Sequence, residues 1–124
     1  MAYTATSEIT ALGSKVITNF SCTSSRSNNV TGSSSGSFYL VEIDNTANTT
    51  TLAYLRIKDA TSAPLASDLV PTWMFAAPPG TKTSYAFPEG QDYTAGLTFW
   101  CTTDTAKQNT TDPQNAVIVR IVAS

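Results

Sequence analysis

Alternation of apolar and polar residues between Thr51 and Pro64 is the feature that most constrains the fold of this chain. Three small or aliphatic side chains alternate with three polar or aromatic ones: Ala53, Leu55 and Ile57 against Tyr54, Arg56 and Lys58. A period of two predicts a β-strand with one face buried. The turn-forming residues from 59 to 64 end this strand.

Six other stretches follow the same pattern, and no stretch has the periodicity of an amphipathic helix. Residues 38–44 and 52–58 are expected to pair as a hairpin, and 59–71 to cross between two sheets. Residues 88–90 are read as a turn. The sequence predicts an all-β fold, a single antiparallel β-sandwich of about seven strands with jelly-roll or immunoglobulin-like connectivity. The predicted strands are 15–22, 38–44, 52–58, 73–77, 81–87, 93–103 and 115–123.

The 124 residues suffice for one domain with its own core. Residues 1–13 are predicted to be an N-terminal arm that ends at a glycine, and residues 14–124 to be the β-sandwich domain. Within the domain, residues 23–37 are so rich in serine and asparagine that we expect a solvent-exposed loop.

Charge and hydropathy exclude several classes of partner. Only 13% of residues are charged, the net charge is −2, and the seven basic residues are dispersed along the chain. Nucleic-acid binding is therefore not expected, because it depends on clustered cations. The N-terminal residues do not form a signal peptide and no run approaches about 20 apolar residues, so neither export nor a membrane partner is expected.

The chain contains no histidine, which removes Ser-His and Cys-His nucleophile pairs and the commonest metal ligand. We expect no cofactor and no metal site. Cys22 and Cys101 are interpreted as two buried reduced thiols, with a disulfide as the alternative. The acidic pairs 42/44 and 89/92 are interpreted as solvated carboxylates. The chain is accordingly not expected to be an enzyme.

Two tryptophans have different expected roles. Trp73 lies in an apolar run and is expected to fill the core. Trp100 lies on the strand face opposite Phe99, which makes it the best candidate for an exposed or interface aromatic. Even for Trp100, burial against a loop or a neighbouring subunit is favoured over ligand binding. Together with Tyr93 and Tyr85, an exposed Trp100 would suit a carbohydrate-binding surface.

The last predicted strand is apolar on both faces. Val117, Val119 and Ile121 are expected to point into the core, yet Ile118 and Val122 on the other face are apolar too. This strand is either central and covered on both faces, or part of an interface.

Residues 38–104 resemble a group of small virion proteins of tailed bacteriophages. The resemblance lies in the runs 41–46 (VEIDNT) and 53–59 (AYLRIKD), and in the turn residues that follow: Ala63-Pro64, Pro71, Pro79-Gly80, Phe87-Pro88, Gly90 and Gly96-Leu97. In that group such chains are structural, decorating capsids or forming parts of tails and fibres. The resemblance implies no catalytic residues.

We therefore expect a non-enzymatic virion structural protein, most simply a capsid decoration (cement) protein that stabilises the shell through subunit contacts. Its partners would be the major capsid protein or other virion proteins, and a homo-oligomer is expected. The alternative is a tail or fibre component, or a carbohydrate-binding module. The expected interface residues are Tyr3, Ile9, Leu12, Trp100, Ile118 and Val122.

Overall fold

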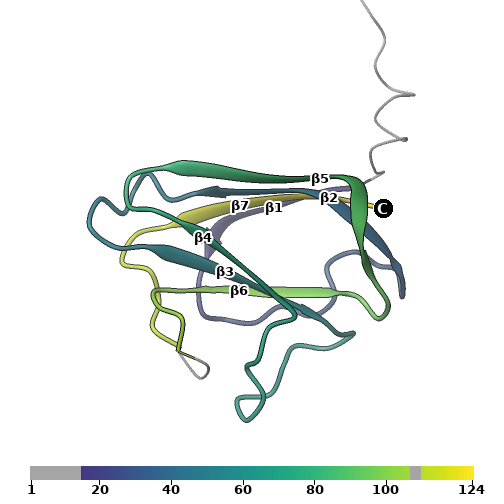
Figure 1. The fold of residues 1–124 in the computed structure, drawn as a ribbon. Helices are drawn as coiled ribbons and strands as arrows, with labels where there is room; N and C mark the ends of the chain where they lie inside the picture. The colour runs from purple at the N-terminus through teal and green to yellow at the C-terminus, as the bar shows by residue number, and fades with distance from the viewer. Residues whose placement is uncertain (1–14, 107–109) are drawn as a thin grey trace, which may run out of the picture.

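A computed structural model describes residues 15–106 and 110–124, and in these residues it shows seven strands, no helix and two antiparallel sheets packed face to face (Figure 1). The four-stranded sheet has the order β1-β7-β2-β5, and the three-stranded sheet has the order β4-β3-β6. The predicted all-β sandwich is confirmed. The strands are β1 (Lys15–Cys22), β2 (Gly36–Asp44), β3 (Ala53–Asp59), β4 (Trp73–Ala77), β5 (Lys82–Tyr93), β6 (Leu97–Thr102) and β7 (Val117–Ala123).

The core lies between the two sheets and consists of the inward residues of every central strand. On β3 the three residues of the alternating pattern, Ala53, Leu55 and Ile57, are fully buried. An aromatic group closes one side of this core, where the Phe38 ring meets Trp73 edge-on with the ring centroids 5.0 Å apart. Trp73 packs against the core as expected.

The strand pairs are nested along the chain, so that each pair encloses the next one in the sequence. β1 pairs with β7, β2 with β5, and β3 with β4, all antiparallel. The expected hairpin of 38–44 with 52–58 is therefore wrong, because the turn between them carries the chain from one sheet to the other. The expected crossing at 59–71 is also wrong, because β3 and β4 pair in the same sheet.

The polar stretch after β1 lies along the edge of β6. Val30 donates its backbone N–H to Leu97 (2.9 Å), Ser27 donates to Phe99 (3.2 Å), and Cys101 donates to Thr23 (2.7 Å). These hydrogen bonds pair the start of residues 23–30 with the end of β6 and the end of this segment with the start of β6. Residues 23–30 therefore lie antiparallel to β6 and pair with it irregularly. The expectation of a solvent-exposed loop is wrong for this part of 23–37, because its backbone groups satisfy those of β6.

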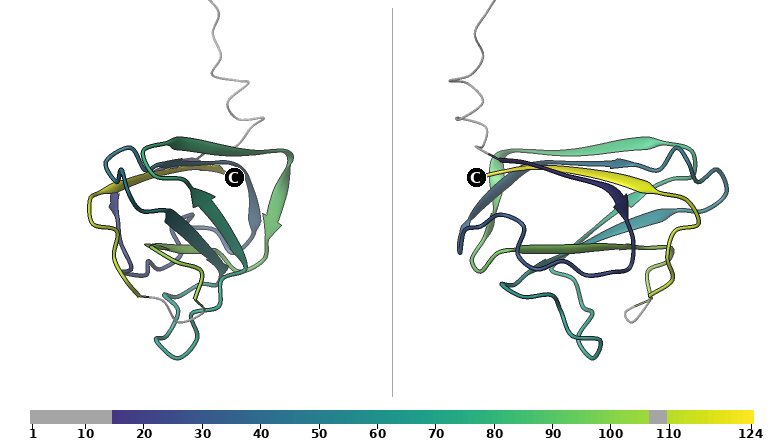
Figure 2. Two further views of the ribbon diagram at one scale, coloured as in Figure 1. Left: turned by 60° about the vertical axis from the view of Figure 1, so that its left-hand side comes forward. Right: turned by 180° about the vertical axis from the view of Figure 1, so that it is seen from behind.

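β5 is longer than expected and includes the residues read as a turn. It runs through Pro88–Gly90 and bends at a register shift opposite Phe38 and Leu40 of β2. Gly90 has a φ of 82°, a conformation that side chains rarely adopt. Figures 1 and 2 show this strand turning from the four-stranded sheet toward the other layer.

Buried asparagines hold one end of the sandwich together. The Nδ2 of Asn45 donates to the carbonyl oxygens of Thr51 (3.0 Å), Ala77 (3.2 Å) and Pro78 (3.2 Å). Asn48 donates to the Oδ1 of Asn45 (2.9 Å). The two turns that link the sheets therefore share one hydrogen-bond network.

An aspartate holds the opposite end. Asp59, the last residue of β3, accepts hydrogen bonds from the backbone N–H groups of Thr94 (2.8 Å), Ala95 (2.7 Å) and Gly96 (3.2 Å). Burial raises the pKa of the Asp59 carboxyl, but these three N–H groups and the Thr94 hydroxyl outweigh it, so the net pKa lies below its ordinary value. The turn between β5 and β6 is thereby fixed to β3.

Candidate interaction surface

The outer face of the four-stranded sheet carries the apolar residues that the sequence singled out on the last strand. Ile118 and Val122 lie half-buried on this face of β7, while Val117, Val119 and Ile121 are fully buried on the other. The strand is thus central in its sheet and has an apolar outer face. The arm residues Tyr3, Ile9 and Leu12 lie outside the described residues.

Strand register joins Val122 into an apolar row across all four strands. Val16 of β1 is opposite Val122, Val122 is opposite Leu40 of β2, and Leu40 is opposite Ala86 of β5. Val16 is 66% exposed. We call Val16, Phe20, Leu40, Ile118 and Val122 the outer apolar face.

Phe20 is the largest exposed side chain on this face, with 68% of its surface accessible. The guanidinium carbon of Arg120 lies 6.0 Å from the Phe20 ring centroid, an arrangement typical of a cation–π contact. Sequence reasoning missed Phe20 and Val16. The sequence could have revealed them, because alternate residues of a strand lie on one face and Val16 and Phe20 share a face. The opposite face already includes the apolar Ile17, so this strand is apolar on both faces.

A row of polar residues crosses the same face next to the apolar row. Arg120 donates to the Glu42 carboxylate at 2.9 Å, and the Nζ of Lys82 lies 3.9 Å from the same oxygen. Thr18 is opposite Arg120 on the β1 side. The charges are paired within the sheet, so the face presents apolar side chains with little unpaired charge around them.

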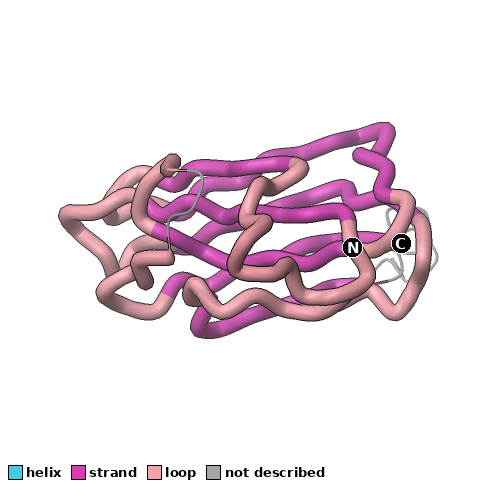
Figure 3. The backbone as a smooth tube through the Cα atoms, turned by 90° about the horizontal axis from the view of Figure 1, so that it is seen from below, coloured by secondary structure: helices cyan, strands magenta, loops and turns pink. Residues whose placement is uncertain are grey.

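Trp100 is not an exposed aromatic, and its burial agrees with the interpretation that was favoured over ligand binding. Trp100 is 1% exposed, although it does lie on the outward side of β6. Its neighbour in the register, Arg56, is also buried and donates to the carbonyl oxygens of Asp104 (2.8 Å) and Ala106 (2.7 Å), which draws that segment over the sheet. Figure 3 shows loops crossing this side of the three-stranded sheet.

Burial explains the electrostatics of Arg56. Burial lowers the pKa of the Arg56 guanidinium, and the nearby Asp104 charge acts in the opposite direction. The Nε of Arg56 donates to the Thr102 hydroxyl at 3.0 Å. Arg56 therefore has a structural role, and the sequence pattern that placed it on a solvated face gave no sign of the covering loop.

The aromatic residues proposed for sugar binding do not form an exposed platform. Tyr93 is 1% exposed and donates its hydroxyl to the Ser124 carbonyl at 2.7 Å. Tyr85 is half-buried and donates to the carbonyl of Ala76. With Trp100 buried as well, two of the three rings are inaccessible to a sugar and only the half-buried Tyr85 remains.

The two cysteines are buried and unbonded to each other, which confirms the interpretation as buried free thiols. Burial raises the pKa of the Cys101 thiol well above its ordinary value, and the hydrogen bond that this thiol donates to the neighbouring Cys22 sulfur adds to this effect. The Cys101 thiol therefore stays protonated near neutral pH, which makes it a poor nucleophile.

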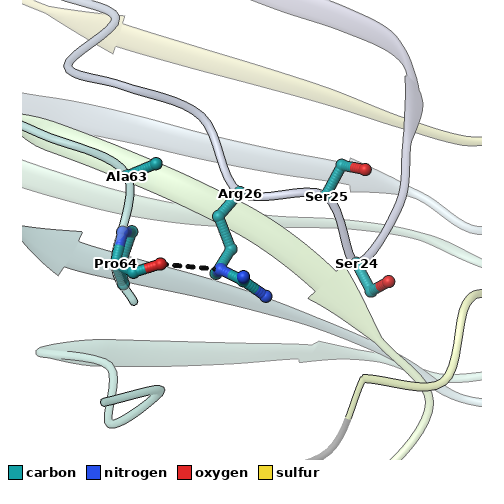
Figure 4. A pocket seen from close by; sticks show the side chains of 5 residues that line it. All are labelled: Ser24, Ser25, Arg26, Ala63 and Pro64. Carbon is teal, nitrogen blue, oxygen red and sulfur yellow. Dashed lines mark hydrogen bonds between the residues drawn. The ribbon is translucent and has the colours of Figure 1, made fainter. Parts of the chain in front are cut away.

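A hollow of about 340 Å³ lies between residues 24–26 and the loop after β3 (Figure 4). The Arg26 side chain crosses this hollow, and its Nε donates a hydrogen bond to the Pro64 carbonyl oxygen at 2.8 Å. The backbone N–H of Ser24 donates a hydrogen bond to the Asp112 carboxylate, and the hydrogen bonds from Ser24 lower the pKa of Asp112. These polar groups join loops to one another.

In residues 15–106 and 110–124 no three potential metal-ligating side chains gather together. The same residues contain no helix long and apolar enough to cross a membrane. Comparison of the chain with protein-family models, with curated proteins and with solved structures finds no match in any of the three.

Proposed function

We propose that the chain is a non-enzymatic structural protein of a virus particle, and that it is a capsid decoration protein which stabilises the shell. The observation that carries this proposal is the outer apolar face, where Val16 and Phe20 are two-thirds exposed on a regular sheet. Several exposed apolar side chains gathered on one face of a rigid sheet favour a site of protein–protein contact.

The energetics indicate how such a face would be used. Full burial of one large apolar side chain stabilises a contact by about 1.5–3 kcal/mol, whereas association costs roughly 4–15 kcal/mol. The outer apolar face of one copy therefore gives only modest affinity by itself. Many copies on one shell, or a second contact such as the N-terminal arm with Tyr3, Ile9 and Leu12, would raise the stabilisation.

The nested strand pairing supports the proposal through its likeness to a jelly roll. Taking residues 23–30 as the second of eight strands, the first pairs with the eighth, the second with the seventh, the third with the sixth and the fourth with the fifth. Jelly rolls occur in viral capsid domains and in lectins. This is an analogy of fold, and it favours the proposal without deciding the function.

An add-back experiment tests the proposal. Virus particles produced without this chain are incubated with the purified wild type, with Val122→Glu, or with a chain lacking residues 1–12, and the chain retained after sedimentation is quantified. We expect Val122→Glu to reduce retention at least about tenfold, because a desolvated carboxylate costs well over 1.4 kcal/mol. Removal of residues 1–12 is expected to abolish retention.

Leu65→Glu is the matched control, because Leu65 is 72% exposed but lies in the loop between β3 and β4, away from the outer apolar face. This variant should be retained as well as the wild type. Equal retention of Val122→Glu, Leu65→Glu and the wild type would show that the outer apolar face does not make the contact.

A further inference from the structure

Three of the four sheet edges carry features that block pairing with another strand. β4 has only five residues and lies between Pro71 and Pro78. β5 contains Pro88, is charged and bends. The edge of β6 is covered by residues 23–30 through backbone hydrogen bonds. Prolines, charges, short strands and covering segments are the usual protection of sheet edges.

The fourth edge, β1, lacks these protections over most of its length. It has eight residues and no proline, and its one charged residue, Lys15, is at its start. Within the described residues β1 pairs with β7 alone, and its ladder is regular from Lys15 to Asn19. An edge of this kind presents a row of unpaired backbone N–H and C=O groups.

We propose that β1 pairs antiparallel with β1 of a second copy of this chain about a two-fold axis at Thr18. In this register Val16 faces Phe20 of the second copy on both sides of the axis. Thr18 faces Thr18 of the second copy, and both types of cross-strand pair stabilise sheets. A two-fold interface requires such self-complementarity, and the spacing of Val16 and Phe20 around Thr18 provides it.

The rest of the strand is compatible with this register. Ile17 would face Asn19 of the second copy. Lys15 would lie beside Ser21, where regular pairing ends because the Ser21 backbone N–H bonds the Asn19 side chain and the β1 register shifts between Asn19 and Cys22. No like charges oppose each other in this register. The two four-stranded sheets would become one continuous sheet, and the two outer apolar faces would adjoin. The dimer would thus present the apolar residues of two copies side by side on one surface, although its formation does not depend on the proposed function.

Light scattering of the purified full-length chain after size exclusion tests the dimer. Because one strand pair is smaller than a standard interface, we expect micromolar affinity, with twice the 13.2 kDa chain mass at about 200 µM and dissociation on dilution toward 1 µM. The double variant Val16→Glu/Phe20→Glu places like charges opposite each other and should have the mass of one chain throughout. Val16→Lys/Phe20→Glu differs only at residue 16, opposes unlike charges, and should restore the dimer in low salt.

Leu65→Glu should dimerise like the wild type, and circular dichroism confirms that each variant is folded. A wild type with the mass of one chain up to about 200 µM would overturn the proposal, as would full dimerisation of Val16→Glu/Phe20→Glu. If both double variants are equally monomeric, the register centred on Thr18 is wrong.

Discussion

Asn45→Ala is expected to lower the free energy of unfolding by about 3 kcal/mol, because it leaves several buried polar groups without partners. Asn45 is fully buried, and its Nδ2 is the donor to three carbonyl oxygens from the two turns that link the sheets. The substitution also removes one of the two acceptors of the Asn48 side-chain amide, the other being the Asn115 carbonyl. A partly satisfied buried network is worse than the sum of its lost bonds. Urea denaturation at neutral pH measures the loss.

Two further variants distinguish the effect of breaking this buried network from the effect of removing a side-chain amide elsewhere. Asn28→Ala removes one exposed hydrogen bond, to the backbone N–H of Ala63, and should cost less than about 1 kcal/mol. Asn45→Asp keeps the shape but directs a carboxylate at carbonyl oxygens, so it should cost more than Asn45→Ala. Similar stability of Asn45→Ala and Asn28→Ala would mean that the network does not hold this end of the sandwich.

Asp59→Asn is expected to lower the free energy of unfolding by about 2 kcal/mol near neutral pH, because both carboxylate oxygens accept hydrogen bonds. In asparagine one of these acceptors becomes a donor that faces backbone N–H groups. The difference between wild type and variant is obtained from urea denaturation of both proteins at a series of pH values.

The difference should depend on pH in a defined direction. The pKa of Asp59 lies below its ordinary value of 3.8 in the folded protein, so its contribution is fully present above that value. It is lost as the pH falls through the folded pKa. Asp44 and Asp112 also have lowered pKa values, but they are common to both proteins and cancel in the difference. A difference that stays constant from neutral pH to about 3 would contradict the assigned role.

The sequence predicted the strands well where one face meets the core and less well where geometry departs from strict alternation. Ala53, Leu55 and Ile57 are buried as their spacing indicated. Alternation across 38–44 would place Phe38 on the face opposite Val41, yet both are buried, because the register shift between Phe38 and Leu40 changes the face. A bulge of this kind has no signature in a hydrophobic pattern.

The candidate site was predicted only in part, for a related reason. The apolar outer positions of the last strand were visible in the sequence, and the structure places Ile118 and Val122 on one face with Phe20. The sequence favoured burial of Trp100 over ligand binding, but it did not identify the segment that covers this residue. This burial depends on loops that cover the three-stranded sheet, and polar loops carry no periodic pattern to reveal what they cover.

Quantitative mass spectrometry of purified virus particles from the source of this gene tests the central claim most directly. The number of copies of this chain is compared with that of the major capsid protein. The proposal of a decoration protein predicts a ratio near one, or a simple fraction of one. A handful of copies per particle would place the chain in a tail or fibre instead, and its absence from the particles would contradict a structural role in the virion.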